Sequence, residues 1–455
     1  MRGTKSEEVG LELAGLWSFN SDFEKKYTGT CVYSDGRGTL NIITEDLSDF
    51  DDFFAHQNYI DIYGITNKGK CTLFSCICTG YTANIHNSNT VKLYVDSLVI
   101  GEYRGIDDDA YSLCTFSVDG LYEWLGSPAL IKHKRDERAI NVECNSGDIF
   151  MFGLSIDIDV DLSFHVHNSY SWSGYSFAVN TKAFIKLKSK NKMSYSYIVN
   201  ALFDINSALC LMFGYSPKIH NINFYHGTEI DGINIINVHA RMPKHAPTSP
   251  IFDEHLFIIP ANYTDDVISV MQNFKAHKKN LEGVAYNIKE LSSGLRIPLA
   301  LSTYMYMQII DVLCKEFNDL KYCEDHEIDV FKKEMKRFIK ENCPPKIRGK
   351  LKTMINYANE YSFEDKTTYI SERISHETKW ELPREYKDII KDAIYLRNKL
   401  THSIFMEKGK RKNPLPMVFS FVRRLAIAET YKTLGVSPET IKKCVLDRED
   451  SEWHM

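Results

Sequence analysis

The sequence has 455 residues, of which 44% are hydrophobic and 25% charged, and its formal net charge is −5. This length predicts about two to four domains with a sizeable core, and the composition is that of a globular protein. The net charge excludes a global electrostatic attraction to nucleic acid, so any contact with RNA must come from a local basic patch.

Two features bear on the cellular compartment. The first residues, Met1–Glu8, contain no apolar segment typical of a secretory signal, and the most apolar stretch, Tyr197–Phe213, is interrupted by Asn200, Asp204 and Asn206. The 11 cysteines are scattered, and none has zinc-ligand spacing with histidine. We therefore expect a cytoplasmic protein with reduced thiols, no membrane association, no metal and no cofactor.

The first segment, residues 1–189, is predicted to be β-rich. Short runs of β-branched and aromatic residues, such as Thr30–Tyr33 and Lys92–Val95, alternate with turn signals. Many short strands favour a sandwich-like antiparallel fold. A short helix at Gly120–Gly126 interrupts it.

The clearest strand pattern runs from Ile156 to His167, where apolar and polar residues alternate. Aspartates and histidines share its polar face, which is a composition typical of metal sites: Asp157, Asp159, Asp161, His165 and His167. Same-face neighbours on a strand lie about 7 Å apart, too far for adjacent side chains to share one ion easily. We interpret this face as solvated and predict no metal site.

Residues 190–290 are predicted to be a mixed α/β connecting region. Apolar residues from Ile198 to Met212 have helical spacing, and Gly214 is expected to end that helix. Strand-like runs and a helix around Asp265–His277 follow.

Residues 291–455 are predicted to be entirely helical, as an antiparallel bundle of about five helices. Cys343-Pro344-Pro345 is expected to end one of these helices. The predicted fold class is therefore α+β, with a β-rich first half, a mixed middle and an all-α bundle at the end.

One helix of this bundle, at about Pro383–Ile404, carries an unusual residue. Its apolar face is formed by Tyr386, Ile389, Ile390, Ala393, Leu396, Leu400 and Ile404. Its polar face is formed by Lys387, Asp388, Lys391, Asp392 and Lys399. Arg397 projects near the middle of the apolar face, where a guanidinium needs an anionic partner or an opening to water.

His402 follows Arg397 by five residues and is the side chain best suited to proton transfer near neutral pH. An alternative is that the Arg397 stem packs on apolar surface while its head reaches solvent, with His402 an unrelated surface residue. However, Arg397-Asn398 followed by His402, on the penultimate helix of a helical terminal domain, resembles the R-x(4–6)-H signature of the HEPN ribonuclease superfamily. Asn directly after the Arg is a common form of that motif.

The N-terminal half carries a second resemblance. Leu16-Trp17-Ser18 opens it, a turn and strand follow at Ile65–Phe74, and Val118–Gly126 closes it. This layout is similar to the β-rich N-terminal domain of ApeA, a family of HEPN-containing bacterial anti-phage proteins.

The resemblance implies a metal-independent endoribonuclease that acts in abortive infection and cleaves cellular RNA, with tRNA as one candidate. His402 would be the general base or acid, and Arg397 would clamp the phosphate and stabilise its charge in the transition state. Asn398 would position His402 or the ribose. The implied partners are RNA, a second or further copy of the chain through the HEPN domain, and a phage protein as trigger at the N-terminal domain.

On a straight helix Arg397 and His402 point roughly 140° apart, so they would not converge on one phosphate. Either the helix distorts or ends near Thr401, or two subunits pair these faces. HEPN proteins typically build their cleft at a dimer interface. A basic run just past the motif is expected either to grip RNA phosphates or to be a plain solvated loop: Lys408, Lys410, Arg411 and Lys412.

Two readings from other classes stay open. In the first, the helical domain is a non-catalytic HEPN binding and dimerisation module, joined to a β-rich ligand-sensing domain. In the second, the β-rich half binds a ligand or carbohydrate and the helical part is structural. Activity on RNA separates the nuclease from both.

Overall fold

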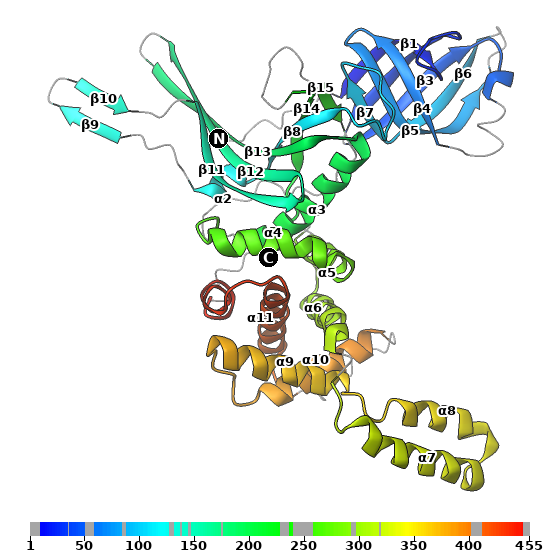
Figure 1. The fold of residues 1–455 in the computed structure, drawn as a ribbon, viewed down its shortest axis with the longest axis vertical. Coiled ribbons are helices and arrows are strands. Elements are labelled where there is room, and N and C mark those ends of the chain that lie inside the picture. The colour runs from blue at the N-terminus through cyan, green and yellow to red at the C-terminus, as the bar shows by residue number, and fades with distance from the viewer. Residues whose placement is uncertain are drawn as a thin grey trace. The chain divides into compact units, whose positions relative to one another are not determined.

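The computed structural model describes residues 10–34, 36–50, 59–83, 88–126, 132–136, 139–143, 147–173, 176–227, 236–239, 258–292, 297–317, 320–401 and 412–448. The chain divides into two compact units, residues 1–264 and 265–455 (Figure 1). Strands dominate the first unit and helices form the second, so the predicted α+β class is confirmed. The predicted domain boundaries near residues 189 and 290 stay predictions.

Six strands of the first unit close a barrel. They are β1 (Leu11–Ser18), β2 (Tyr27–Ser34), β3 (Arg37–Thr44), β4 (Ile60–Thr66), β5 (Gly69–Thr82) and β6 (Asn89–Val95). The order β5-β4-β1-β2-β3-β6 returns to β5 through a β5–β6 pairing. Large side chains fill the interior, among them Trp17, Leu40 and Leu93, all fully buried. The β half is thus a barrel with an attached sheet, where the sequence suggested a sandwich-like layout.

Strand β5 closes the barrel because it changes partner along its length. Its first part pairs with β4, and its last part, Ile77–Thr82, pairs with β6. The chain bends at Ser75, which has a φ of 52° and lies where the register with β4 shifts, just before the β6-paired part. The backbone N–H of Ser75 donates to Oδ1 of Asp61 at 3.2 Å, which holds the bend.

The rest of the first unit is an open antiparallel sheet of order β11-β12-β13-β8-β14-β15-β7, joined to the barrel where β7 pairs with β5. Its strands are β7 (Ser97–Ile100), β8 (Tyr111–Val118), β11 (Gly147–Asp157), β12 (Val160–Ser173), β13 (Ser176–Met193), β14 (Ile219–Tyr225) and β15 (Ile236–His239). A separate hairpin consists of β9 (Lys132–Asp136) and β10 (Ala139–Glu143).

The predicted single strand from Ile156 to His167 is wrong. The structure has a hairpin there: β11 ends at Asp157, β12 begins at Val160, and Ile158 in the turn is 92% exposed. The predicted solvated face is also partly wrong, because His165 is only 8% exposed. Among the described residues, no three His, Cys, Asp or Glu side chains gather in an arrangement that could hold a metal ion.

His165 is buried against aromatic surface. Its ring stacks on Phe184 with 5.4 Å between centroids, and its Nε2 lies 2.9 Å from Oγ of Ser163. Burial, together with the nearby Lys186 ammonium, lowers the pKa of His165 to about 4. The ring is therefore neutral at physiological pH.

Two helices contact this sheet: α2 (Leu121–Leu125), at the predicted short helix, through Trp124 on Phe164, and α3 (Tyr195–Phe213) through Tyr195 on Phe224. Helix α3 ends where Gly214 adopts a φ of 76° and its N–H donates to the Cys210 carbonyl, as its sequence predicts. By length and composition alone α3 could cross a membrane, but 56% of that window is buried inside the unit. We interpret α3 as a core helix.

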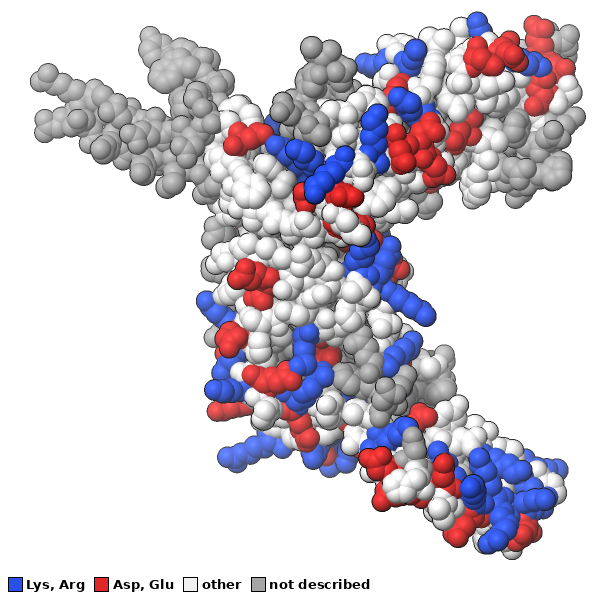
Figure 2. All heavy atoms as spheres, in the orientation of Figure 1, with Lys and Arg blue, Asp and Glu red and all other residues white. Residues whose placement is uncertain are grey.

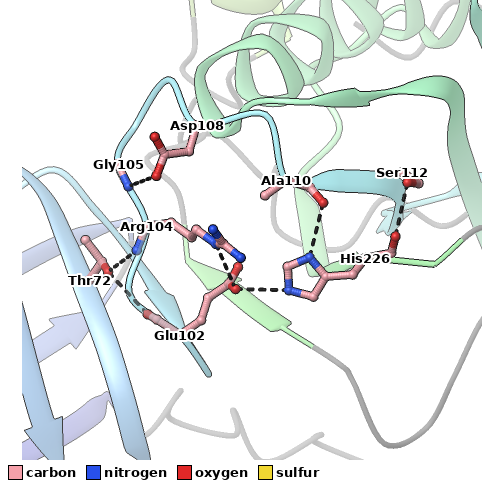
Figure 3. A network of polar contacts seen from close by, with 8 residues as sticks. All are labelled: Thr72, Glu102, Arg104, Gly105, Asp108, Ala110, Ser112 and His226. Carbon is pink, nitrogen blue, oxygen red and sulfur yellow. Dashed lines mark hydrogen bonds and ion pairs between the residues drawn. The ribbon is translucent and has the colours of Figure 1, made fainter. Parts of the chain in front are cut away.

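A polar network lies where the barrel meets the open sheet (Figure 3). Oε2 of Glu102 accepts from Nε of Arg104 at 3.2 Å and lies 3.0 Å from Nε2 of His226. Nδ1 of His226 lies 3.1 Å from the Ala110 carbonyl oxygen. The Thr72 hydroxyl of β5 donates to the Glu102 carbonyl, so the network ties the barrel to the end of β14.

The second unit is built from helices α4 (Thr264–Ala276), α5 (Lys278–Leu291), α6 (Leu299–Leu313), η3 (Cys314–Phe317), α7 (Asp325–Asn342), α8 (Pro345–Asn356), α9 (Phe363–Thr378), α10 (Tyr386–Thr401), α11 (Leu415–Thr433), α12 (Pro438–Ile441) and η4 (Lys442–Leu446). Helix α6 packs against α5, α10 and α11, and α9 packs against α10 and α11. The predicted stop at Cys343-Pro344-Pro345 separates α7 from α8. Helix α4, predicted in the middle region, belongs to this unit.

Candidate functional site

Arg397 lies on α10, next to the buried core residues Ala393 and Leu396. Its Nη2 donates a hydrogen bond to Oδ2 of Asp311 on α6 at 2.9 Å. Its guanidinium carbon lies 4.6 Å from the ring centroid of Phe363, the first residue of α9. The anionic partner that the apolar surroundings require is therefore Asp311, and the aromatic ring supports the cation from a third helix.

The Arg397–Asp311 pair is open to water. The Arg397 side chain is 28% exposed and the Asp311 side chain 44%. Ion pairs exposed to this extent contribute about 1 kcal/mol or less to the free energy of unfolding. Among the described residues, only Asp311 accepts one of the five N–H donors that a guanidinium carries. Arg397 thus keeps donors for an incoming anion such as a phosphate.

Cys314 lies in the same electrostatic neighbourhood. Burial raises the pKa of its thiol to about 12, and the Asp311 carboxylate adds to the increase, while Lys366 and Arg397 act in the opposite direction. The group is therefore a thiol near neutral pH and not an activated nucleophile. This neighbourhood offers cations and hydrogen-bond donors for binding an anion.

The structure describes Asn398 and Thr401 but not His402. Asn398 is exposed. The Thr401 hydroxyl donates to the Arg397 carbonyl at 2.8 Å, within the last turn of α10. His402 lies outside the described residues, so both ways of bringing it near Arg397, a distorted or ending helix and the pairing of two subunits, stay predictions.

Of the predicted basic run, Lys408, Lys410 and Arg411 also lie outside the described residues. Lys412 is described, and its Nζ forms an ion pair with Asp388 of α10 at 3.1 Å. That pair is exposed, with 72% of the Lys412 side chain accessible.

Asp392, assigned from the sequence to the polar face of α10, is only 5% exposed. Its carboxylate accepts the backbone N–H groups of Lys412 and Asn413, the latter at 2.8 Å. The Asn413 side-chain amide donates to it as well, at 2.9 Å. A buried carboxylate satisfied by several donors anchors the residues that precede α11 to the middle of α10.

Sequence reasoning missed two other arginines of this unit that lie close to apolar surface. Nη2 of Arg373 lies 2.5 and 2.6 Å from the two carboxylate oxygens of Glu429, a residue that is 1% exposed. Arg423 is 3% exposed and lies 5.1 Å from the Phe419 ring centroid. A buried arginine is therefore not by itself a sign of a functional site here. Arg397 differs from Arg373 in its partner: the Asp311 side chain is 44% exposed, whereas that of Glu429 is buried.

Comparison with known families covers most of the chain. The ApeA N-terminal domain 1 family model matches residues 12–274, which is more than half of the chain. The Apea-like HEPN model matches residues 304–431 and includes Asp311, Phe363 and Arg397. No curated protein and no solved structure matches the chain. The barrel-and-sheet unit and the helical unit thus each contain a matched domain, and the chain belongs to the ApeA family of anti-phage proteins with a HEPN nuclease domain.

Proposed function

We propose that this protein is a HEPN endoribonuclease that cleaves cellular RNA, tRNA among the candidates, when phage infection triggers it. The observation that supports this proposal is the exposure of Arg397 and the few contacts of its guanidinium. Within the matched HEPN region its guanidinium is open to water, held by one half-exposed carboxylate and by an aromatic ring. An RNA phosphate can approach such a group without unfolding the helical core.

The proposed reaction is attack of a ribose 2′-oxygen on the adjacent phosphate. His402 removes the 2′-OH proton or protonates the departing 5′-oxygen, and proton transfer of this kind contributes about 10²- to 10⁴-fold. Arg397 binds the non-bridging phosphate oxygens and stabilises their growing negative charge. Asn398, exposed on the next position of α10, orients His402 or the ribose. The products are a 2′,3′-cyclic phosphate and a 5′-OH, and the reaction requires no metal ion.

The proposal includes the assembly and its control. Two or more copies pair through their HEPN domains and build the cleft between them, which brings Arg397 and His402 of different subunits together. The N-terminal unit binds a phage protein and changes how the HEPN domains pair. The nuclease acts in the cytoplasm, where Lys408, Lys410, Arg411 and Lys412 contact RNA phosphates.

A second candidate is a HEPN module that binds or dimerises without catalysis. The ion pair with Asp311 and the contact with Phe363 support it, because Arg373 and Arg423 of the same unit have comparable carboxylate or ring contacts. In that case Arg397 would hold α6, α9 and α10 together and do nothing else.

Sequencing RNA ends after expression of the full chain in infected and uninfected cells tests the proposal. We expect new RNA ends and growth arrest with the wild type and none with His402→Ala, whose thermal stability should be unchanged. New RNA ends that persist at the wild-type level in His402→Ala would contradict the catalytic assignment. Dimerisation without any new RNA ends in the wild type would support the second candidate.

A further inference from the structure

The hairpin formed by α7 and α8 concentrates positive charge. Residues 332–352 contain two acidic residues, Glu334 and Glu341, against nine basic ones: Lys332, Lys333, Lys336, Arg337, Lys340, Lys346, Arg348, Lys350 and Lys352. This segment carries a net +7 (nine minus two), and the whole hairpin, which also contains Asp325, Glu327 and Asp329, a net +4 (nine minus five), in a chain whose net charge is −5. Figure 2 shows the lysines and arginines of the hairpin grouped toward one end.

The cations of α7 share one face. Lys332, Lys336 and Lys340 follow each other at four-residue steps, which makes a stripe about 12 Å long. At about 100° per residue, Lys333 and Arg337 fall beside this stripe, so all five lie within an arc of about 140°. Lys336 and Lys340 are exposed and Lys332 is half-exposed.

These charges are not compensated inside the described part of the protein. Arg348 donates to the Cys343 carbonyl, but none of the other eight cations forms an ion pair or hydrogen bond with a described residue. Lysines elsewhere in the unit differ: Lys387 pairs with Glu372 and Lys391 with Glu364. Like charges at four-residue steps destabilise a helix by about 0.2–0.5 kcal/mol per pair, so the helix itself does not favour this pattern.

Packing does not explain the pattern either. In the described part of α7 and α8, Ile339 and Ile355 are the buried hydrophobic residues. Phe331 and Phe338 of α7 are 47% and 53% exposed. At about 100° per residue both rings fall on the side of α7 opposite the five cations, so neither buried packing nor these rings account for the basic face.

We propose that the basic face of the α7–α8 hairpin, centred on Lys332, Lys336 and Lys340, binds the phosphate backbone of the RNA substrate. The identity of the polyanion rests on the proposed function. A chain with a net negative charge holds a polyanion only through a local positive surface, and each phosphate neutralised by a lysine releases counterions, so affinity falls as salt rises.

The test measures binding of the full-length chain to fluorescein-labelled bulk tRNA at several salt concentrations. All proteins carry His402→Ala so that the RNA stays intact. K332Q/K336Q/K340Q should weaken binding at least about tenfold, and the slope of log affinity against log salt should become shallower by about 2–3, or 0.7–0.9 per lost contact. K332R/K336R/K340R should retain both affinity and slope, because it keeps the charges.

The matched control K275Q/K278Q/K279Q removes three lysines near the junction of α4 and α5 and should leave affinity and slope nearly unchanged. Equal affinity and slope for K332Q/K336Q/K340Q and the wild-type hairpin would overturn the proposal, and so would an equal loss in both glutamine variants. Binding through the hairpin to phosphatidylserine-containing vesicles, with tRNA affinity unaffected by the substitutions, would overturn it in favour of a membrane surface. If binding depends on the hairpin but the chain with His402 intact cuts no RNA, this proposal stands and only the proposed nuclease activity is contradicted.

Discussion

Arg397 and Asp311 lie 86 residues apart in the chain, yet Nη2 of the arginine donates to Oδ2 of the aspartate at 2.9 Å. The contact joins α10 to α6, and the Phe363 ring of α9 lies against the same guanidinium. The site is therefore made by three helices that only the folded bundle brings together. This relationship also offers a way to separate a catalytic role of Arg397 from a structural one.

Substitution of either partner removes the same ion pair, so the two variants form a matched set. Arg397→Ala and Asp311→Ala should each lower the free energy of unfolding by about 1 kcal/mol or less for the pair, and Arg397→Ala should lose about 0.5–1 kcal/mol more with its ring contact. Cleavage should fall at least about 10²-fold in Arg397→Ala, whereas Asp311→Ala should stay within about tenfold of wild type because the guanidinium remains. Urea denaturation and single-turnover cleavage check both quantities. Equal losses of cleavage in the two variants would indicate that the pair matters only for structure.

The sequence predicted those parts of this site that depend only on the local residue pattern. The apolar face of α10 and the position of Arg397 within it are local, and they correctly indicated that an anionic partner or an opening to water was needed. Asp311 was not found, because its position across the bundle depends on how α6 and α10 pack. The burial of Asp392 was not found for a similar reason: its partners, the N–H groups of Lys412 and Asn413, belong to a different segment of chain.

Helix α9 shows a second limit. Its region was predicted to be helical, but no apolar periodicity marked α9 individually, because its buried face is largely hydroxylic, with Thr367, Ser371 and Thr378 beside Ile370 and Ile374. Their hydroxyls donate to carbonyls one turn back, so they are buried without an apolar signal. The capping box of Ser362 and Asp365 was the local signal that could have revealed the helix. The β11–β12 turn was missed because Ile158-Asp159 contains no glycine, proline or asparagine.

The proposed reaction also predicts how cleavage responds to chelators. Because Arg397 supplies the positive charge at the phosphate and His402 the proton transfer, cleavage should be unchanged in excess EDTA, and fragments should end in 2′,3′-cyclic or 3′-phosphate with 5′-OH. End-specific ligation and phosphatase treatment of purified fragments distinguish these ends. Strict dependence on Mg²⁺ with 5′-phosphate products would point to a different active site.

The buried His165 predicts a pH dependence of stability in the barrel-and-sheet unit. Its pKa is about 4 in the folded chain, against about 6.5 for an unperturbed histidine. The unfolded state therefore binds the proton more readily. The stability contributed by the neutral ring is complete above about pH 6.5 and is lost as the pH falls from there to about 4.

This loss should be on the order of 1–2 kcal/mol between pH 7 and pH 5. His165→Phe keeps an aromatic ring against Phe184 and removes the titrating group, so its stability should fall less over the same interval. Urea denaturation of both proteins at the two pH values measures the difference. Identical decreases in the two proteins would show that His165 does not control this response.

The boundary of the helical unit makes a prediction about its isolated form. Asp266 of α4 is only 9% exposed and accepts the Ser437 N–H at 2.7 Å, while Asn273 of α4 donates to the Leu434 carbonyl at 2.9 Å. These bonds join α4 to the end of the chain. A segment 265–455 should therefore unfold cooperatively, whereas a segment 291–455, which lacks α4 and α5, should be destabilised by several kcal/mol through lost burial and unsatisfied polar groups. Circular dichroism during thermal unfolding of the two segments checks this.

Segment 265–455 also tests the proposed division between sensing and cleavage. A constitutively active ribonuclease would poison its host, so the proposed function requires that a trigger releases cleavage by binding with different affinity to the resting and active states. If the first unit carries that sensor, segment 265–455 with Arg397 and His402 intact should either cut RNA without infection or ignore infection altogether, while the full chain cuts only after infection. RNA end sequencing in infected and uninfected cells compares them, with Arg397→Ala in each as the inactive control. A segment that responds to infection as the full chain does would place the sensor in the helical unit, because the barrel and its sheet would then be dispensable for control.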